Sequence, residues 1–417
     1  MVNKNFSVLI AGRVFTNIGD SLYAVASMWL VYDLTQSSLY TGLAGFLTMS
    51  PVALQFLIGP LIDQAQHKSI LIYSQMLQAI LLALIPLAYL FGVLSVWMVL
   101  VINPIASIIQ QFVYPTQAAI LPTIIEKKFL TKANSVMNAT YQLLDVILLG
   151  LSGLIIAALG AISVYMLNSA TFLAAMILFF YLKVPKTEFD TNGMMDFTLK
   201  ERWGNYKRDL SEGYKFIKNS FIPKFLLAAI LANFIIGAVT AILPDFAANR
   251  GGINIYGWYL GAMSAGLLIG SLLANYFKKF PLGKVTIKGF FLSGISWMLA
   301  GFIEIDLISV IFYGLSYISI GITNVLFLSS LQEVLPANFL GRVFSFVAGA
   351  TSIAAPLGAL LGGFLATFTG SWLVFILGSI ATGFVSVYWL AIPTLRNLPT
   401  PDNLGENLFM PKSDTAI

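Results

Sequence analysis

Twelve long apolar stretches constrain this chain of 417 residues more than any other feature of its sequence. Each is long enough for a helix of about 20 residues, the length that crosses the hydrocarbon core of a bilayer. Only 10% of the residues are charged, against about 25% in soluble domains, and the mean hydropathy is +0.86. Because backbone polar groups in lipid need internal partners, unbroken runs of this length predict helices and not a barrel. The sequence therefore predicts an all-α membrane protein.

The hydropathy of the chain sets the expected span boundaries, and Pro104 and Pro115 interrupt the fourth span. The twelve spans are expected near residues 8–33, 39–62, 69–92, 95–121, 134–159, 161–182, 222–246, 255–277, 285–303, 307–331, 342–368 and 371–393. We expect an N-terminal six-helix bundle over 1–182 and a C-terminal six-helix bundle with a tail over 222–417. Between them, 183–221 is expected to be a cytoplasmic linker with an amphipathic helix. That linker either governs how the two halves move or is a solvated connection that anionic lipid holds through its basic residues.

The basic residues predict the orientation of the spans. All but two of the 23 Lys and Arg residues fall in the termini, the linker or the ends of spans on one expected side. The exceptions are Arg13, inside the first span, and Arg250, in a connection on the opposite side. The positive-inside rule therefore predicts that both termini are cytoplasmic.

The composition argues against the catalytic and metal sites that are common in soluble enzymes. The chain has no cysteine and one histidine, which argues against thiol catalysis and against His/Cys metal sites. It also lacks the GxxxxGK[ST] phosphate-binding loop, so we expect no ATPase activity of its own. We expect no enzyme, no cofactor, no metal and no nucleic-acid partner.

The two halves of the chain resemble one another at a nearly constant offset. Asp33 and Asp245 end the first and seventh spans, 212 residues apart. The segments QAAILP and LQEVLP end at Pro122 and Pro336, 214 residues apart. Such a repeat is typical of transporters built from two related halves, with the substrate site between them. The sequence therefore predicts two pseudo-symmetric bundles and movement by alternating access.

Two spans carry acidic residues that lie deep within them. In the first, Arg13, Asn17 and Asp20 share one helical face at i, i+4 and i+7. A charge there costs at least about 2.5–3.5 kcal/mol unless it faces water or a partner. The stripe is either part of a transport pathway or an Arg–Asp pair that only orients the helix. In the fifth, Gln142 and Asp145 share a face, and Asp145 is preferred as the proton carrier because Arg13 should keep Asp20 ionised.

Further polar stripes recur in the fourth, seventh and tenth spans. They either line a cavity or hydrogen-bond to neighbouring helices, which contributes only about 0.6–2 kcal/mol per contact. Their matching positions in the two halves favour the cavity. The candidate cavity residues are Asn17, Asn103, Ser107, Gln110, Tyr114, Gln117, Gln142, Asn233, Thr240, Tyr313, Tyr317 and Asn324.

Glycines four residues apart predict where helices pack closely. Gly266 with Gly270, and Gly358 with Gly362, form such pairs in the eighth and eleventh spans. Small residues at this spacing let two helix backbones approach each other. Packing alone explains them, so we assign them no ligand.

The segment GPLIDQAQHK, from Gly59 to Lys68, resembles the signature that joins the second and third helices in the major facilitator superfamily. The signature is Gly-x-x-x-Asp followed by basic residues. The segment departs from it at Gln64 and His67, where the family usually has Arg or Lys, and at Gln66, where it usually has Gly. In that superfamily the aspartate engages the start of the eleventh helix and helps to latch the cytoplasmic side. The resemblance therefore implies a latch made by Gly59, Asp63, Lys68 and Arg342.

Three further segments resemble the bacterial branch of this superfamily that holds macrolide-efflux proteins and the enterobactin exporter. They are NIGDSLYAVASMWLVYDLTQSS, YPTQAAILP and GRVFSFVAGATSIAAPLGALLGG. The resemblance implies a monomeric, multi-pass protein of the bacterial inner membrane with a small-molecule substrate, surrounded by membrane lipid. We therefore expect proton-coupled efflux of lipophilic or amphipathic compounds, drug-like or macrolide-like.

Other functions remain open within transport: export of a siderophore, export or flipping of a lysophospholipid, and import of a solute. A receptor or scaffold that transports nothing is disfavoured, because it has no use for costly buried carboxylates.

Overall fold

The structure, a computed structural model, describes residues 4–54, 58, 62, 66–184, 204, 208, 211, 214, 218, 222–335 and 337–404. Within these ranges, some side chains on three helices lie outside the description, those of Gln142, Asp145 and Arg342 among them. The chain forms two compact units, residues 1–202 and 203–417. Most of the expected linker lies outside the described residues, so its amphipathic helix stays a prediction.

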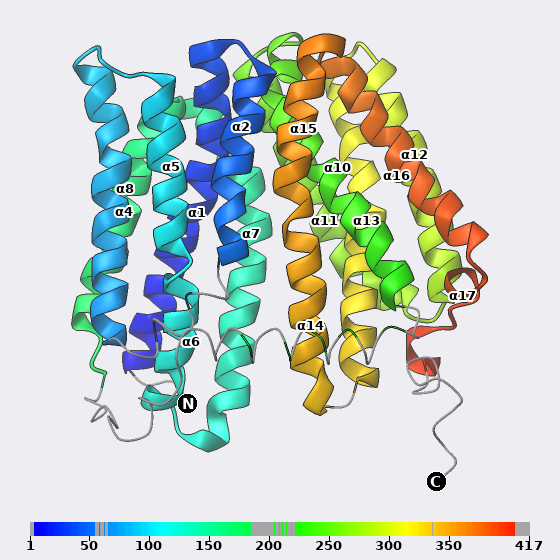
Figure 1. The fold of residues 1–417 in the computed structure, drawn as a ribbon, viewed down its shortest axis with the longest axis horizontal. Helices are drawn as coiled ribbons and strands as arrows, with labels where there is room; N and C mark the ends of the chain where they lie inside the picture. Colours follow the sequence, from blue (N-terminus) through cyan, green and yellow to red (C-terminus); the bar gives the residue numbers. More distant parts are fainter. Residues whose placement is uncertain are drawn as a thin grey trace. The chain divides into compact units, whose positions relative to one another are not determined.

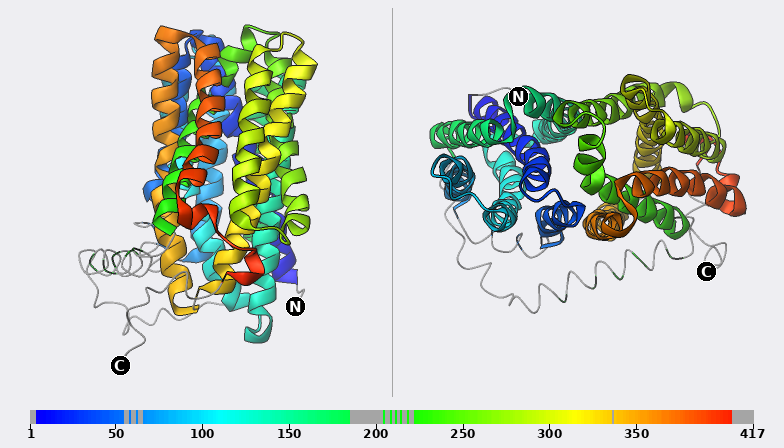
Figure 2. Two further views of the ribbon diagram at one scale, coloured as in Figure 1. Left: turned by 90° about the vertical axis from the view of Figure 1, so that its right-hand side faces the viewer. Right: turned by 90° about the horizontal axis from the view of Figure 1, so that it is seen from above.

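Helices account for nearly all of the described N-terminal unit (Figure 1). They are α1 (Lys4–Thr35), α2 (Ser38–Met49), η1 (Ser50–Leu54), α4 (His67–Leu90), α5 (Val96–Gln110), α6 (Val113–Ile124), η2 (Lys127–Phe129), α7 (Leu130–Leu159) and α8 (Ala161–Tyr181). Seen from above, the long helices of this unit run side by side along one direction (Figure 2).

The C-terminal unit is built in the same way. Its elements are α10 (Ile222–Ala248), α11 (Ile253–Phe277), α12 (Leu282–Phe302), α13 (Asp306–Val334), α14 (Ala337–Ser352), α15 (Ala354–Thr369), α16 (Ser371–Ala391), α17 (Pro393–Arg396) and η3 (Pro401–Asn403). Among the described residues of the whole chain, nine helical segments are long and apolar enough to cross a membrane. The first, second and fifth expected spans correspond to α1, to α2 with η1, and to α7. The predicted all-α membrane fold is confirmed.

The same pattern of neighbours recurs inside each unit, as expected for two related halves. In the N-terminal unit, α1 packs on α7 and α8, α4 packs on α8, and α2 packs on α5. In the C-terminal unit, α10 packs on α15 and α16, α12 packs on α16, and α11 packs on α13. Counted by span, these are the same four pairs in both halves.

Two of the expected spans are each divided into two helices, and a proline explains each break. In the fourth span, α5 ends at Gln110 and α6 begins at Val113. Pro115 has no N–H, and its ring would clash with the carbonyl of Gln111 in a continuous helix. The backbone instead makes tighter i→i−3 bonds at Gln111 and Phe112, with N···O distances of 3.2 Å. Pro356 likewise lies four residues after Ser352, where α14 ends.

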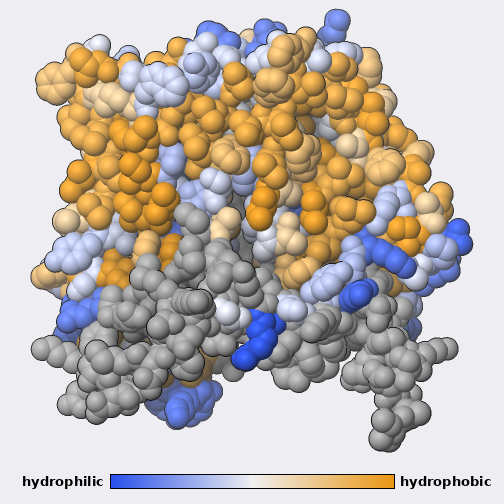
Figure 3. Space-filling model, viewed as in Figure 1, coloured by the Kyte–Doolittle hydropathy of each residue, from blue (hydrophilic) through white to orange (hydrophobic). Residues whose placement is uncertain are grey.

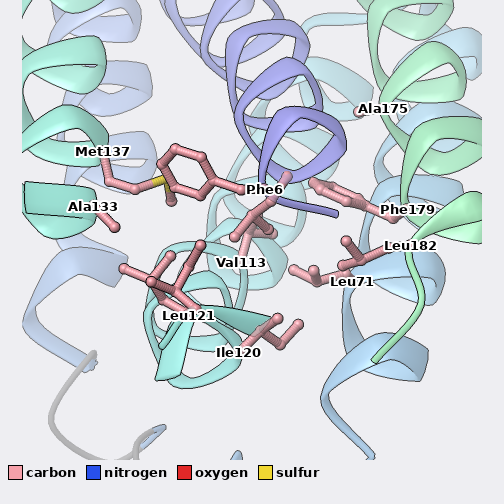
Figure 4. Close-up of a cluster of buried hydrophobic side chains, with 12 residues drawn as sticks. Phe6, Leu71, Val113, Ile120, Leu121, Ala133, Met137, Ala175, Phe179 and Leu182 are labelled. Atoms are coloured by element: carbon pink, nitrogen blue, oxygen red, sulfur yellow. The ribbon is translucent and has the colours of Figure 1, made fainter. Parts of the chain in front are cut away.

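A cluster of buried apolar side chains holds α6 in place at one end of the N-terminal unit (Figure 4). Val113, Ile120 and Leu121 of α6 meet Phe6 of α1 and Phe179 of α8 in this cluster. Each of the five side chains is almost fully buried. The cluster therefore positions α6 against α1, which carries the predicted polar stripe.

Glycines form the closest helix contacts of the C-terminal unit, as their spacing predicted. A β-carbon at Gly270 of α11 would overlap the carbonyl oxygen of Ile318 in α13. A β-carbon at Gly358 of α15 would overlap the carbonyl oxygen of Phe234 in α10. At both places only glycine lets the two backbones touch.

Candidate functional site

Polar contacts join α1 to α6 inside the N-terminal unit. Arg13 donates from Nη1 to Gln117 Oε1 at 2.8 Å. The Tyr114 hydroxyl donates to Asp20 Oδ2 at 2.8 Å and also lies within hydrogen-bond reach of Asn17 Oδ1. All five residues were predicted from the stripes of the first and fourth spans. We call them the α1–α6 cluster.

The Tyr114 side chain lies between the two charged residues of this cluster. The guanidinium carbon of Arg13 is 4.9 Å from the centre of the Tyr114 ring and 5.5 Å from that of Tyr141 on α7. The two rings meet edge to face at 5.3 Å. Among the residues that the structure describes, Arg13 forms no salt bridge. Tyr114 connects it to Asp20, the charge with which the sequence had suggested a direct pair.

The α1–α6 cluster is buried but has unused hydrogen-bonding capacity. Arg13, Asn17, Asp20 and Gln117 are all buried, with Asp20 the most exposed at 8%. Within the described part of the chain, the donors Arg13 Nε, Asn17 Nδ2 and Gln117 Nε2 have no hydrogen-bond partner. A buried donor without a partner is costly, by about 1–3 kcal/mol. These donors could therefore be satisfied by water or by the acceptor atoms of a solute.

A second buried network, which the sequence analysis missed, begins one turn away on α1. The Thr16 hydroxyl donates to Gln75 Oε1 at 3.1 Å, and Gln75 Nε2 donates to Gln78 Oε1 at 3.1 Å. Gln78 Nε2 then donates to the carbonyl of Ala106 on α5 at 3.3 Å. Two glutamines three residues apart in the otherwise apolar third span were the available signal.

The three remaining candidate cavity residues of the fourth span lie on α5 and bond inside the same unit. The bonds join Asn103 to Ser27 (2.6 Å) and Tyr165 (2.8 Å), Ser107 to the carbonyl of Thr48 (2.7 Å), and Gln110 to the Tyr23 hydroxyl (3.2 Å). Each side chain is therefore held by a neighbouring helix. This arrangement is the helix–helix bonding that the sequence left open as the alternative to a cavity.

The candidate cavity residues of the C-terminal unit do not form a comparable cluster. Asn233 and Thr240 hydrogen-bond to carbonyls of their own helix, α10, at 2.9 and 2.7 Å. Asn324 is exposed on α13. Tyr313 and Tyr317 share a hydrogen bond of 3.0 Å and are each 1% exposed.

Both tyrosines of α13 belong to an aromatic core. Trp297 of α12 meets the Tyr313 ring edge to face at 5.2 Å and lies 5.6 Å from the Tyr317 ring. Tyr259 of α11 and Phe375 of α16 pack on Tyr313 from two further sides, at 5.1 and 5.4 Å. Their surroundings are those of helix packing and not of a polar cavity.

Several predicted residues cannot be placed. The side chains of Gln142, Asp145 and Arg342, and all of Gly59 and Asp63, lie outside the described residues. Lys68, the described member of the expected latch, donates from Nζ to the Phe180 carbonyl at 2.7 Å. It therefore caps the last turn of α8, where a cation is favourable.

Arg250 joins two helix connections in the C-terminal unit. The sequence predicts that it lies on the opposite side of the membrane from most of the other basic residues. Arg250 donates to the carbonyls of Ile303 and Gly301 at 2.9 and 3.2 Å, at the end of α12. It also lies 3.9 Å from Asp306, at the start of α13. Arg250 therefore ties the α10–α11 connection to the α12–α13 connection, a structural role.

Taken together, the matching helix neighbours of the two described units and the buried polar clusters in membrane-spanning helices are typical of a polytopic membrane transporter. The family of transmembrane secretion effectors matches residues 1–287. The chain belongs to this family, within the major facilitator superfamily.

Named relatives agree with this assignment. The chain is 24% identical over 381 residues to macrolide efflux protein A of Streptococcus pyogenes, covering 88% of this chain and 90% of that one. It is 23% identical over 403 residues to the multidrug efflux pump Tap of Mycolicibacterium fortuitum, covering 94% and 95%. Among solved structures, an inward-facing, occupied bacterial homolog of the human lysosomal transporter Spinster has a similar fold. The TM-score is 0.66 at 12% identity, with 94% and 96% of the two chains covered.

Proposed function

We propose that this transporter exports lipophilic or amphipathic small molecules from a bacterial cell by alternating access, driven by protons. It would lie in the inner membrane with both termini in the cytoplasm, as the distribution of its basic residues predicts. The observation that carries the proposal is the α1–α6 cluster, which combines a carboxylate, a guanidinium, a phenol and three unused donors inside a membrane-spanning bundle. The names of the macrolide and multidrug efflux relatives support the same class of substrate.

The α1–α6 cluster would recognise the polar part of such a compound. The unused donors of Arg13, Asn17 and Gln117 suit ether, carbonyl and hydroxyl oxygens. The Tyr141 ring, 39% exposed beside them, offers an apolar surface and a π-face for a cationic amine. Asp20 with Arg13 would shape and charge the site, and Asp145 would carry the proton.

The remaining predicted residues keep supporting roles in this proposal. Asn233, Thr240 and Asn324 would contribute polar groups from the second half. Gly59, Asp63, Lys68 and Arg342 would latch the cytoplasmic side, so Asp63→Asn should slow turnover and leave ligand binding intact, because the residue biases one conformer. Loss of binding in that variant would contradict a latch.

Reconstituted vesicles with an imposed pH gradient test the coupling. Asp145→Asn should abolish pH-driven accumulation but spare downhill or exchange flux, because the substitution keeps the size of the side chain and removes its titration. Asp20→Asn should instead weaken binding, most for cationic substrates. Wild-type accumulation in Asp145→Asn would transfer the proton-carrier role to Asp20. Proton-coupled transport that survives in both single variants and in the double variant would refute proton antiport.

The same vesicles separate the alternative substrates. A range of dyes, macrolides, siderophores and lysophospholipids should show accumulation of the first two classes only. Movement of lysophospholipid between leaflets, or uptake in the opposite direction, would replace drug export by flipping or import.

A further inference from the structure

An open apolar groove runs between α10 and α16 in the C-terminal unit. One part has a volume of about 400 Å³. It is lined by Leu227, Ala228, Ile230, Leu231, Phe234, Phe384, Val385 and Tyr388. The adjoining part, of about 210 Å³, is also walled by α15, and both Leu231 and Phe234 line the two parts. The groove is therefore continuous, and none of the described residues that line it is charged. The surface over these helices is mostly apolar (Figure 3).

The dimensions of the groove match one hydrocarbon chain of a lipid. Its α10 wall extends from Leu227 to Val239 along one helical face, which is about 18 Å at a rise of 1.5 Å per residue. One leaflet contributes about 15 Å, half of the hydrocarbon core. On α16, the wall from Val374 to Tyr388 runs in the opposite direction over about 21 Å.

A basic residue lies at one end of the groove. Lys224 comes one turn before Leu227 and Ala228, on the same face of α10. The hydroxyl of Tyr388, which lines the groove, donates to the Lys224 carbonyl at 3.0 Å. Lys224 Nζ donates to Thr394 Oγ1 at 3.2 Å, which leaves two of its three N–H groups for another acceptor.

No acidic residue on the nearby parts of α10, α16 and α17 offsets the positive charge of Lys224. The side chain is exposed, and α10 contains no acidic residue before Asp245, near its far end. Neither α16 nor α17 contains one. Lys224 also lies at the end of the unit where Lys278 bonds to Asp402, among most of the basic residues of this half. An anionic group at the end of an apolar chain is the complement of this arrangement.

We propose that the groove binds an anionic phospholipid of the bilayer, with an acyl chain along α10 and α16 and the phosphate at Lys224. Since lipid tails are as apolar as the groove, burial of the chain alone confers little preference. Selectivity therefore comes from the headgroup. We expect about a fivefold preference for an anionic over a zwitterionic headgroup, the factor equivalent to about 1 kcal/mol for one basic residue near an anionic surface.

Native mass spectrometry of the purified full-length chain tests this proposal, using phosphatidylglycerol and phosphatidylcholine with identical acyl chains. Lys224→Gln should remove the preference for phosphatidylglycerol. Lys279→Gln is the matched control, because Lys279 is an exposed lysine of the same unit whose Nζ lies 3.8 Å from the centre of the Tyr276 ring. This control should keep the preference.

A second variant tests the apolar half of the site. Leu231→Trp fills the junction of the two parts of the groove and should lower cross-linking by a phosphatidylglycerol with a photoreactive acyl chain, which in the wild type should label α10 and α16. Equal binding of the two lipids to the wild type, or equal losses in the Lys224 and Lys279 variants, would refute the proposal. If a macrolide or dye displaced phosphatidylglycerol, the groove would belong to the transported solute. If inorganic phosphate alone displaced it, only the phosphate would be recognised and not the acyl chain. Either result would also overturn it.

Discussion

At the scale of single residues, the Tyr114 side chain joins the members of the α1–α6 cluster. Its hydroxyl reaches Asp20 and Asn17, while its ring faces the guanidinium of Arg13. Helical spacing predicted that these residues share faces of two spans. It could not predict that the ring would separate the cation from the carboxylate, because that depends on how α6 is rotated after the break at Gln111.

Tyr114→Phe removes the hydroxyl and keeps the ring. We expect substrate binding to weaken by about tenfold or more, because a hydrogen bond to a charged group is worth about 1.5–3 kcal/mol. Binding measured by fluorescence or calorimetry, together with vesicle transport, checks this. Tyr259→Phe is the control, since its buried hydroxyl bonds to Ser309 at 2.5 Å in the other unit. It should lower thermal stability without changing binding, and equal binding in both variants would contradict the role of Tyr114.

At the scale of the element, the divided fourth span determines where the polar side chains of α6 lie. The Gln111 side chain donates to the Ser107 carbonyl at 3.1 Å, which the tighter backbone turn leaves without its usual partner. The break is therefore satisfied locally. Pro115 was visible in the sequence, but the contacts of Tyr114 and Gln117 with α1 were not.

Pro115→Ala restores an N–H and removes the clash with the Gln111 carbonyl. We expect the span to straighten, Tyr114 and Gln117 to move relative to α1, and transport to fall several-fold while thermal stability is kept or raised. Pro104→Ala is the matched control, because Pro104 lies inside α5 without breaking it. Distances between spin labels on α1 and α6 would report the movement. Unchanged distances and full transport in Pro115→Ala would show that Pro115 does not set the position of α6.

The glycine contacts permit a paired prediction. Gly270→Ala should destabilise the C-terminal unit by about 1–3 kcal/mol, because the added carbon overlaps the Ile318 carbonyl of α13. Gly349→Ala has open space around the added carbon and should stabilise α14 by about 0.4–1 kcal/mol. Thermal unfolding of the two variants in detergent compares them directly. A Gly270→Ala protein as stable as the wild type would mean that α11 and α13 can separate freely.

At the scale of the whole molecule, the sequence predicted the all-α membrane fold, whereas the candidate site stays a prediction. Hydropathy identifies each span independently of its neighbours, so the spans and the two related halves could be recognised from the sequence. Which neighbour covers a polar face is a tertiary property that hydropathy does not contain. This explains why Gln75 and Gln78 were missed, and why Tyr313 and Tyr317, placed correctly on one face, meet an aromatic core.

The orientation of the chain in the membrane is a prediction of the same scale. Reporter fusions after Lys68, Lys132 and Arg396 should be cytoplasmic, and fusions within 34–38 or near Gly251 should be external, because basic residues gather on the cytoplasmic side. Reporter enzymes that are active on only one side of the membrane make the measurement. A cytoplasmic signal within 34–38 would overturn the assignment of spans.

The unequal polarity of the two units has a consequence for how such a protein diversifies. Side-chain hydrogen bonds join α1 to α4 and α6 in the N-terminal unit. In the C-terminal unit, Asn233 and Thr240 of α10 bond to their own helix, and Tyr313 and Tyr317 of α13 lie in an aromatic core. If the two units arose by duplication, the N-terminal unit would have become the part that adapts to new compounds. The C-terminal unit would have become the part that changes little. If the chain exports drugs as proposed, selection for resistance to a new drug should therefore accumulate substitutions in the N-terminal unit. Selected substitutions that gathered in the C-terminal unit would contradict this expectation.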